Sequence, residues 1–171
     1  MKLHTQSAKI RLFEIILLTL FGVLMYVSQV VMASLPNIEL VSLLIILTAR
    51  KFGYKSLVSV YVFVWCEILT YGLSLWVVNY LYVWAILCLI ICLVRKIDSV
   101  WLYTLISALF GLAFGSICSI PSFFIGGISF GISYIISGFG FDLAHCVGNA
   151  VLTFLLYRPL TIVLEKALKT L

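Results

Sequence analysis

The stretch IILLTLFGVLMYVSQVVMASL, residues 15 to 35, contains no charged side chain. A helix needs about 20 apolar residues to cross a hydrocarbon core of about 30 Å, so this stretch is long enough to span a bilayer. It is too long for a signal-peptide core, and no A-x-A-like cleavage site follows it, so we expect it to stay in the mature protein. Pro36 and Asn37 are expected to end its helix.

The rest of the chain has the same apolar character. Of 171 residues, 64% are hydrophobic and 10% are charged, whereas soluble domains are about 45–50% apolar and about 25% charged. The chain is therefore an integral membrane protein, and we expect residues 1–171 to form one domain. The net charge of +5 indicates membrane topology, and without a basic patch interleaved with aromatic residues we expect no nucleic-acid partner. The five cysteines lie within apolar runs without zinc-ligand spacing, which predicts buried thiols and no metal site.

Charged residues divide the chain into further apolar segments. The apolar run of residues 40–49 is short for a membrane span. It crosses a membrane only if Glu39 and the Arg50–Lys51 pair reach towards the two interfaces. Residues 56–94 carry one charge, Glu67, and are best divided at YGLS, residues 71–74. We therefore expect an all-α membrane protein with six transmembrane helices, at about residues 10–35, 38–53, 56–72, 75–95, 99–120 and 142–165.

The basic residues support six crossings. With six, all eleven Lys and Arg fall on one side of the membrane. The positive-inside rule makes that side cytoplasmic, with both termini inside. This agreement is the main reason to count residues 38–53 as a span. The two halves show no sequence repeat, so an inverted-repeat transporter is not supported.

The segment SIPSFFIGGISFGISYIISGFGF, residues 119–141, is apolar enough for a seventh helix. A seventh crossing would place the basic residues of the C-terminal segment outside, against the charge rule. Its glycines also weaken a regular helix. We therefore expect an extension of the fifth helix and then an outer loop over residues 121–141, which can dip into the membrane where protein covers it.

Polar residues gather towards the outer side of this topology. Asp142, His145 and Asn149 in GFGFDLAHCVGN (138–149) are spaced i, i+3 and i+7, so they share one helix face. Ionisable residues inside a membrane are costly and usually face a cavity or a partner. Asp142 also suits a helix N-cap. His145 and Asn149 either line a pocket or join neighbouring helices by hydrogen bonds. The same level is expected to hold Asn37, Glu39, Glu67, Asn79 and Tyr80.

Two side-chain patterns lie on the fourth and fifth helices. Trp76, Tyr80 and Trp84 are spaced i, i+4 and i+8. They form either an interfacial belt facing lipid, which suits Trp76, or a stacking surface for a flat ligand at the deeper Tyr80 and Trp84. Small residues at steps of four on the fifth helix predict close helix packing inside the protein, with docking to another subunit as the alternative; these are Ser107, Gly111, Gly115 and Ser119.

Several catalytic motifs are missing from the sequence. It has no Walker A motif, no H-E-x-x-H and no G-x-S-x-G, so P-loop ATP hydrolysis and the common hydrolase signatures are not expected. HCVGN (145–149) has the H-x-x-x-N spacing of CAAX-processing intramembrane peptidases, but the paired-glutamate motif that those enzymes need is absent.

Two stretches resemble the S components of energy-coupling factor (ECF) transporters. They are LPNIELVSLLIIL (35–47), after the first helix, and GFGFDLAHCVGNAVLTFLLYRPL (138–160), in the last helix. The resemblance extends over essentially the whole chain in length, helix number and expected topology. It implies a small membrane protein that binds a vitamin in a pocket open to the outside, beneath the loop between the first two helices. The resemblance also implies delivery through a transmembrane T component and two cytoplasmic ATPases, with the S component toppling in the membrane.

The chain departs from this family at one motif. Many members carry an A-x-x-x-A-type motif on the first helix for docking to the T component. Here the helix offers Gly22, Ser28 and Ala33 without a strict small-x-x-x-small step. The docking surface is therefore not assigned from the sequence.

We predict a substrate-binding S component of a prokaryotic plasma membrane, with no catalytic activity and no cofactor of its own. Glu39, Asp142 and His145 are expected to supply charge or hydrogen bonds, and Tyr80 and Trp84 to supply stacking. The full set of predicted binding residues is Asn37, Glu39, Asn79, Tyr80, Trp84, Asp142, His145 and Asn149.

The expected substrate is cobalamin or a cobalamin precursor, then hydroxymethylpyrimidine or pantothenate. One alternative function is an intramembrane enzyme of peptidase type that uses His145 with Glu39 or Glu67. The other is a secondary carrier that works without partners.

Overall fold

The computed structural model describes residues 2–35 and 37–169, and this part of the chain is all-helical. The elements are α1 (Lys2–Val31), α2 (Val41–Phe52), the 3₁₀ turn η1 (Gly53–Ser56), α3 (Leu57–Tyr71), α4 (Leu75–Val94), α5 (Val100–Cys118) and α6 (Ile120–Lys169). Among the described residues, five helical stretches are long and apolar enough to cross a membrane: Leu12–Val31, Val41–Tyr71, Leu75–Val94, Val100–Cys118 and Ile120–Lys169. The prediction of a helical, membrane-compatible protein is confirmed.

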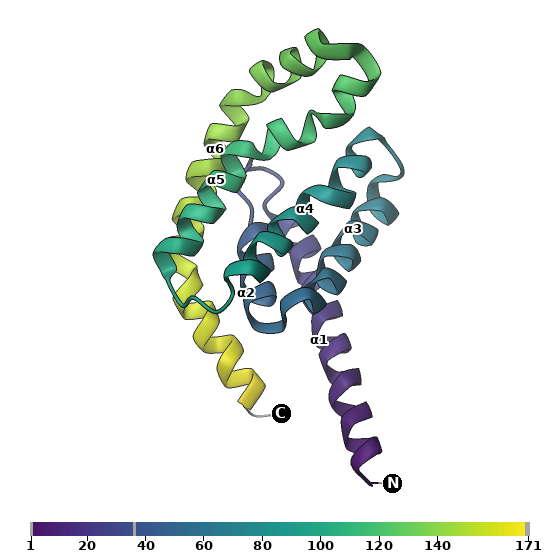
Figure 1. The fold of residues 1–171 in the computed structure, drawn as a ribbon, viewed down its shortest axis with the longest axis vertical. Helices are drawn as coiled ribbons and strands as arrows, with labels where there is room; N and C mark the ends of the chain where they lie inside the picture. Colours follow the sequence, from purple (N-terminus) through teal and green to yellow (C-terminus); the bar gives the residue numbers. More distant parts are fainter. Residues whose placement is uncertain (1, 36, 170–171) are drawn as a thin grey trace.

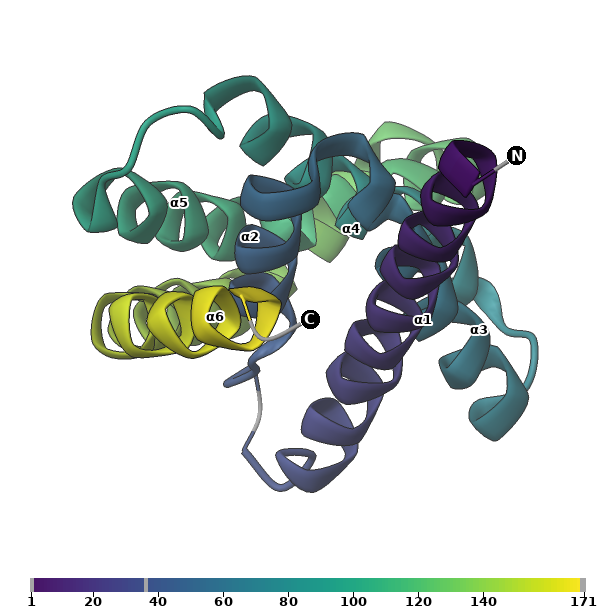
Figure 2. The same ribbon diagram turned by 90° about the horizontal axis from the view of Figure 1, so that it is seen from below.

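The helices pack mainly as three pairs. α1 packs against α3, α2 against α4, and α5 against α6. Figure 1 shows α1 and α6 with their terminal ends at the same end of the molecule. Figure 2 shows α5 and α6 side by side, with α2 and α4 between that pair and α1.

α2 is the most enclosed helix. Its 12 residues are about 18 Å long, less than the roughly 30 Å of a hydrocarbon core. Every side chain from Val41 to Ala49 is buried. A helix whose side chains are buried on all faces lies inside the protein. α2 therefore forms the centre of the core, and the exposed large apolar side chains lie on its neighbours.

Ion pairs gather at the end of the molecule that holds the termini. Asp98, in the link between α4 and α5, pairs with Arg50 of α2 at 3.0 Å and with Arg158 of α6 at 3.3 Å. Lys55 of η1 pairs with Glu14 of α1. The opposite end carries the α1–α2 link, the α3–α4 turn and a kink in α6 (Figure 1). Charged residues are thus concentrated at one end of the bundle.

The expected loop over residues 121–141 is wrong, because this segment is helical. α6 is broken only at Gly127, whose φ of 74° and ψ of −170° lie outside the helical region. In apolar surroundings a segment must satisfy its backbone hydrogen bonds internally, which favours a helix over a loop even at the other glycines. The last helix therefore extends well before residue 142. Asp142 lies inside it, so the expected N-cap role of Asp142 is also wrong.

The small residues of α5 lie against α6. A Cβ on Gly111 would lie 2.8 Å from the carbonyl carbon and oxygen of His145, and one on Gly115 would lie 2.5 Å from Oδ2 of Asp142. Ser107 accepts a hydrogen bond from Thr153 of α6. The prediction of close internal packing is confirmed.

Candidate functional site

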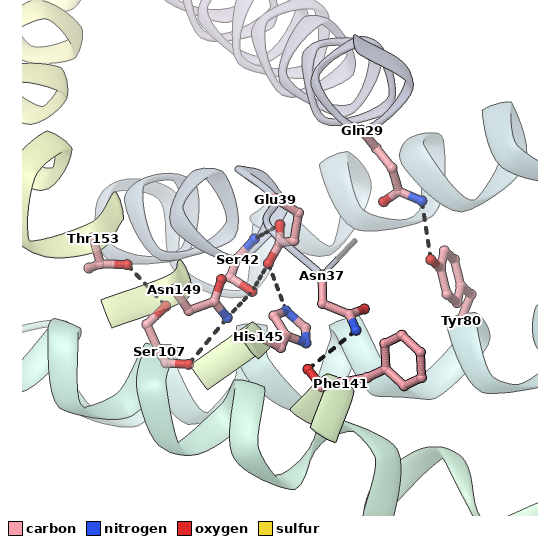
Figure 3. A network of polar contacts seen from close by, with 10 residues as sticks. All are labelled: Gln29, Asn37, Glu39, Ser42, Tyr80, Ser107, Phe141, His145, Asn149 and Thr153. Carbon is pink, nitrogen blue, oxygen red and sulfur yellow. Dashed lines mark hydrogen bonds and ion pairs between the residues drawn. The ribbon is translucent and has the colours of Figure 1, made fainter. Parts of the chain in front are cut away.

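Five of the eight predicted binding residues line one cavity of about 160 Å³, which we name the Glu39 cavity. It lies between the α1–α2 link and helices α1, α4, α5 and α6 (Figure 3). The five are Asn37, Glu39, Tyr80, Trp84 and His145.

Glu39 is held by three hydrogen bonds. Its Oε2 accepts from the backbone N–H of Ser42 at 2.8 Å, and its Oε1 accepts from the Ser42 hydroxyl at 2.5 Å. Nε2 of His145 lies 3.1 Å from the same Oε1. Glu39 stands just before α2, where the positive end of the helix dipole stabilises a carboxylate. These bonds hold the side chain inside the protein, where it is buried.

His145 closes the other side of the cavity. Its ring is 4.8 Å from the ring of Phe114, centroid to centroid, in an edge-to-face arrangement. Gly111 lets α6 approach α5 closely at this position. This close approach fixes the position of the imidazole relative to α5. The contact of the imidazole with Glu39 joins α6 to the start of α2 (Figure 3).

Asn149 lies one turn further along α6 and joins helices. Its Nδ2 donates to the Ser42 hydroxyl at 3.1 Å and to the Ser107 carbonyl at 3.2 Å. Figure 3 shows these bonds continuing the chain of contacts that begins at His145 and Glu39. Asn149 is not among the residues that line the Glu39 cavity. Asn149 therefore joins helices, whereas His145 both lines the cavity and joins α6 to the α1–α2 link.

Asp142 faces a neighbouring cavity. Its Oδ1 accepts a hydrogen bond from the N–H of Gly115 at 2.9 Å. This second cavity of about 360 Å³ shares Asn37 and Phe114 with the Glu39 cavity. Nδ2 of Asn37 also donates to the Phe141 carbonyl at 3.2 Å, which ties the α1–α2 link to α6.

The aromatic ladder on α4 is continuous. The ring centroids of Trp76 and Tyr80 are 4.9 Å apart, and those of Tyr80 and Trp84 are 5.6 Å apart, both edge to face. Trp84 is buried, and its Nε1 has no hydrogen-bond partner in the described part of the chain. The hydroxyl of Tyr80 accepts from Nε2 of Gln29 at 3.2 Å. Tyr80 and Trp84 therefore face the protein and its cavities, as the stacking alternative requires.

The structure does not bring Asn79 to any of these cavities. Its Oδ1 accepts a hydrogen bond from the Tyr82 hydroxyl at 2.9 Å, and that hydroxyl lies at the same distance from the Ile117 carbonyl. Residues 79 and 80 are neighbours on a helix and point to different sides, so a shared depth in the membrane did not imply a shared pocket.

Sequence reasoning missed three residues near the cavity. Gln29 and Phe114 line it, and Ser42 positions Glu39. Gln29 is the one amide side chain in the uncharged stretch 15–35, a signal that could have been used. Phe114 and Ser42 carried no such signal in the sequence, because aromatic and serine residues are common in membrane helices.

The arrangement suits recognition by hydrogen bonds and stacking. It offers a carboxylate, an imidazole, a tyrosine hydroxyl and an unpaired indole N–H around aromatic walls. In residues 2–35 and 37–169, no three His, Cys, Asp or Glu side chains are grouped as a metal ion would require. No family model, curated protein or solved structure matches the chain.

Proposed function

We propose that the chain is the substrate-binding S component of an ECF-type transporter. In this role it captures a small micronutrient outside the cell and passes it to a T component and two ATPases. The observation that carries the proposal is the Glu39 cavity, because five residues predicted from the sequence to bind a ligand surround one space. The resemblance of residues 35–47 and 138–160 to S components supports the same assignment.

The proposed topology has six crossings with both termini in the cytoplasm. The ion pairs around Asp98 and Lys55 lie at the end with the termini, and cytoplasmic ends carry the excess of basic residues. α2 then counts as a short crossing completed by the protein around it. In this orientation the Glu39 cavity lies at the outer end.

The cavity favours a small substrate. Pockets that bury drug-sized ligands hold roughly 300–1,000 Å³, and the Glu39 cavity holds about 160 Å³. This size favours a single-ring molecule over a corrinoid. Its lining includes the Glu39 carboxylate and no Lys or Arg among the described residues, which disfavours an anion such as pantothenate. We therefore propose a hydroxymethylpyrimidine-like heterocycle as the substrate, stacked near Tyr80 and Trp84.

The α1–α2 link is the proposed entrance. Asn37 has a φ of 57°, a left-handed conformation that asparagine tolerates better than most residues. Its hydrogen bond to the Phe141 carbonyl is exposed, so this contact can break and re-form at low cost. We propose that opening at Asn37 admits the substrate and that closure covers it.

We propose a docking surface for a T component that does not include Gly22 of α1. A Cβ on Gly22 would lie 2.6 Å from the Ser59 carbonyl of α3, so Gly22 is used in packing within the chain. Large apolar side chains of α1 are exposed instead, including Leu20, Leu24 and Val27. A T component that docks on α1 would meet this surface.

Reconstitution tests the proposal. The chain is purified gently from its own cells, and co-purifying subunits are identified by mass spectrometry. The proposal expects a second membrane subunit and two ATPases, and it expects liposomes to take up the substrate only when these are included with ATP. Uptake by the chain alone would contradict the proposal and assign a secondary carrier.

The Glu39–His145 contact favours a second candidate, an intramembrane enzyme. A carboxylate bonded to one nitrogen of an imidazole leaves the other nitrogen to act as a general base. The distance of 3.1 Å meets that requirement. Product formation by the purified chain, without ATP or partners, would favour this candidate over the S component.

A further inference from the structure

A third cavity, of about 310 Å³, lies between α1, α3 and α4 and contains Glu67. We name it the Glu67 cavity. It shares Gln29 and Tyr80 with the Glu39 cavity and has Trp76 and Tyr71 in its wall. It adjoins the Glu39 cavity, since Ala33 also lines both, and it differs in containing Glu67 instead of Glu39 and His145.

Glu67 is a buried carboxyl group without a partner. Glu67 is 3% exposed, and its Oε1 has no hydrogen-bond partner in the described part of the chain. Burying an unpaired carboxylate is costly, and in membrane helices such groups usually serve a function. Protonation would remove the charge but would leave the same Oε1 unsatisfied. A ligand with a hydrogen-bond donor would satisfy it.

The charge around Glu67 favours a cation. No Lys or Arg is found among the described residues that line the cavity. The Lys and Arg ion pairs of Glu14 and Asp98 lie at the other end of the described chain. A positively charged ligand would therefore supply the charge that the described chain does not provide.

The walls of the cavity favour an organic cation. The rings of Tyr71 and Trp76 are 6.4 Å apart and those of Trp76 and Tyr80 are 4.9 Å apart, so they form a continuous aromatic wall. Aromatic faces attract ammonium and guanidinium groups. Inorganic cations such as Ca²⁺ or Mg²⁺ need about six or more oxygen ligands, which a mostly aromatic wall does not supply.

We propose that the Glu67 cavity binds a small organic cation, with the Glu67 carboxylate accepting hydrogen bonds from an ammonium or amidinium group against Tyr71, Trp76 and Tyr80. The site is distinct from the Glu39 cavity. It stands independently of the S-component assignment, because it concerns binding by the chain without partners.

The test compares benzylammonium with its uncharged analogue benzyl alcohol by isothermal titration of the purified protein, with empty micelles as the blank. The intact protein binds benzylammonium more tightly than benzyl alcohol. Glu67→Gln weakens benzylammonium at least about tenfold, because the amide still accepts a hydrogen bond but no longer carries the negative charge that attracts the ammonium. The same variant leaves benzyl alcohol unchanged. Glu14→Gln, the same substitution at the opposite end, changes neither affinity.

Two further variants separate binding from folding. Glu67→Asp keeps the charge and retains the preference for benzylammonium. Trp76→Leu weakens benzylammonium about threefold to tenfold through loss of a cation–aromatic contact, and it affects the alcohol less. Equal affinity of the intact protein and Glu67→Gln for benzylammonium would overturn the proposal. So would an absence of benzylammonium binding at millimolar concentration, or its displacement by sodium at equal concentration.

Discussion

Glu39 shows how a carboxyl group is accommodated in an apolar chain. Its two oxygens receive a backbone N–H, a hydroxyl and an imidazole, all within 3.1 Å. The spacing of Asp142, His145 and Asn149 correctly placed them on one face, but it did not predict that His145 reaches Glu39. That contact joins residues far apart in the sequence, and only the packing of α6 against α2 creates it.

Replacing His145 by alanine should destabilise the protein strongly. The change leaves Glu39 buried without its imidazole partner, and the loss of a hydrogen bond to a charged group costs about 1.5–3 kcal/mol. Reversible unfolding by SDS in mixed micelles measures the free energy. Glu39→Gln should cost less, because an amide keeps an acceptor for Ser42.

Asn79→Ala is the matched control for a polar residue on a membrane helix. The Tyr82 hydroxyl that contacts Asn79 also reaches the Ile117 carbonyl, so the loss should stay below about 1 kcal/mol. A loss as large as that of His145→Ala would contradict the special position of the Glu39–His145 pair.

At the scale of elements, the contact between α5 and α6 depends on glycine. Gly111→Ala places a Cβ 2.8 Å from the His145 backbone, which cannot move aside as a side chain can. Overpacking of this kind costs about 1–3 kcal/mol. The same unfolding assay should show that loss, together with weaker ligand binding, because the shift of α6 moves His145.

Gly138→Ala on α6 is the matched control for Gly111→Ala. Nothing lies within 4 Å of the added Cβ, and alanine favours a helix over glycine by about 1 kcal/mol. The variant should be as stable as the parent or more so. Equal effects of the two substitutions would show that the helices do not touch at Gly111.

The kink in α6 should depend on the backbone conformation of Gly127. Gly127→Ala meets no neighbouring atom but has a φ of 74°, whereas Gly140 is also in open space and has no positive φ. A left-handed conformation costs a non-glycine residue about 1–2 kcal/mol. Gly127→Ala should therefore be less stable than Gly140→Ala by that amount. Equal stability of the two variants would mean that α6 is not kinked there.

Residues 119–141 explain why the element boundaries were only partly predictable. The five glycines there correctly indicated a break in the helix, but the helix is broken at only one of them, Gly127. Helix propensity is a weak guide where the backbone has no water to bond to, so the remaining glycines stay helical. The core position of α2 was not predictable from its sequence either, since a short apolar run suits a buried helix and a short span equally well.

At the scale of the whole molecule, hydropathy and charge were the most informative signals. They predicted helices close to the observed α3, α4 and α5, because long apolar runs and clustered basic residues act locally. The small packing residues of α5 were predicted because their spacing is also a local pattern in the sequence. The Glu67 cavity and the partners of Asn149 depend on tertiary packing and could not be predicted.

The proposed topology can be measured by cysteine labelling. The five native cysteines are first replaced by alanine, and single cysteines are placed at exposed positions of the two ends. A membrane-impermeant maleimide on intact cells should label Leu73→Cys, in the α3–α4 turn, and not Lys55→Cys in η1. Permeabilised cells should label both. The reverse pattern would place the Glu39 cavity on the cytoplasmic side.

The most direct test of ligand capture at Glu39 is native mass spectrometry of the gently purified protein and of Glu39→Gln, after both are incubated with a mixture of vitamins and their precursors. We predict that the intact protein carries one small molecule per chain and that Glu39→Gln carries little or none, with the two proteins equally helical. A protein that carries no small molecule, or a variant that retains it as fully as the parent, would contradict the assignment of the Glu39 cavity.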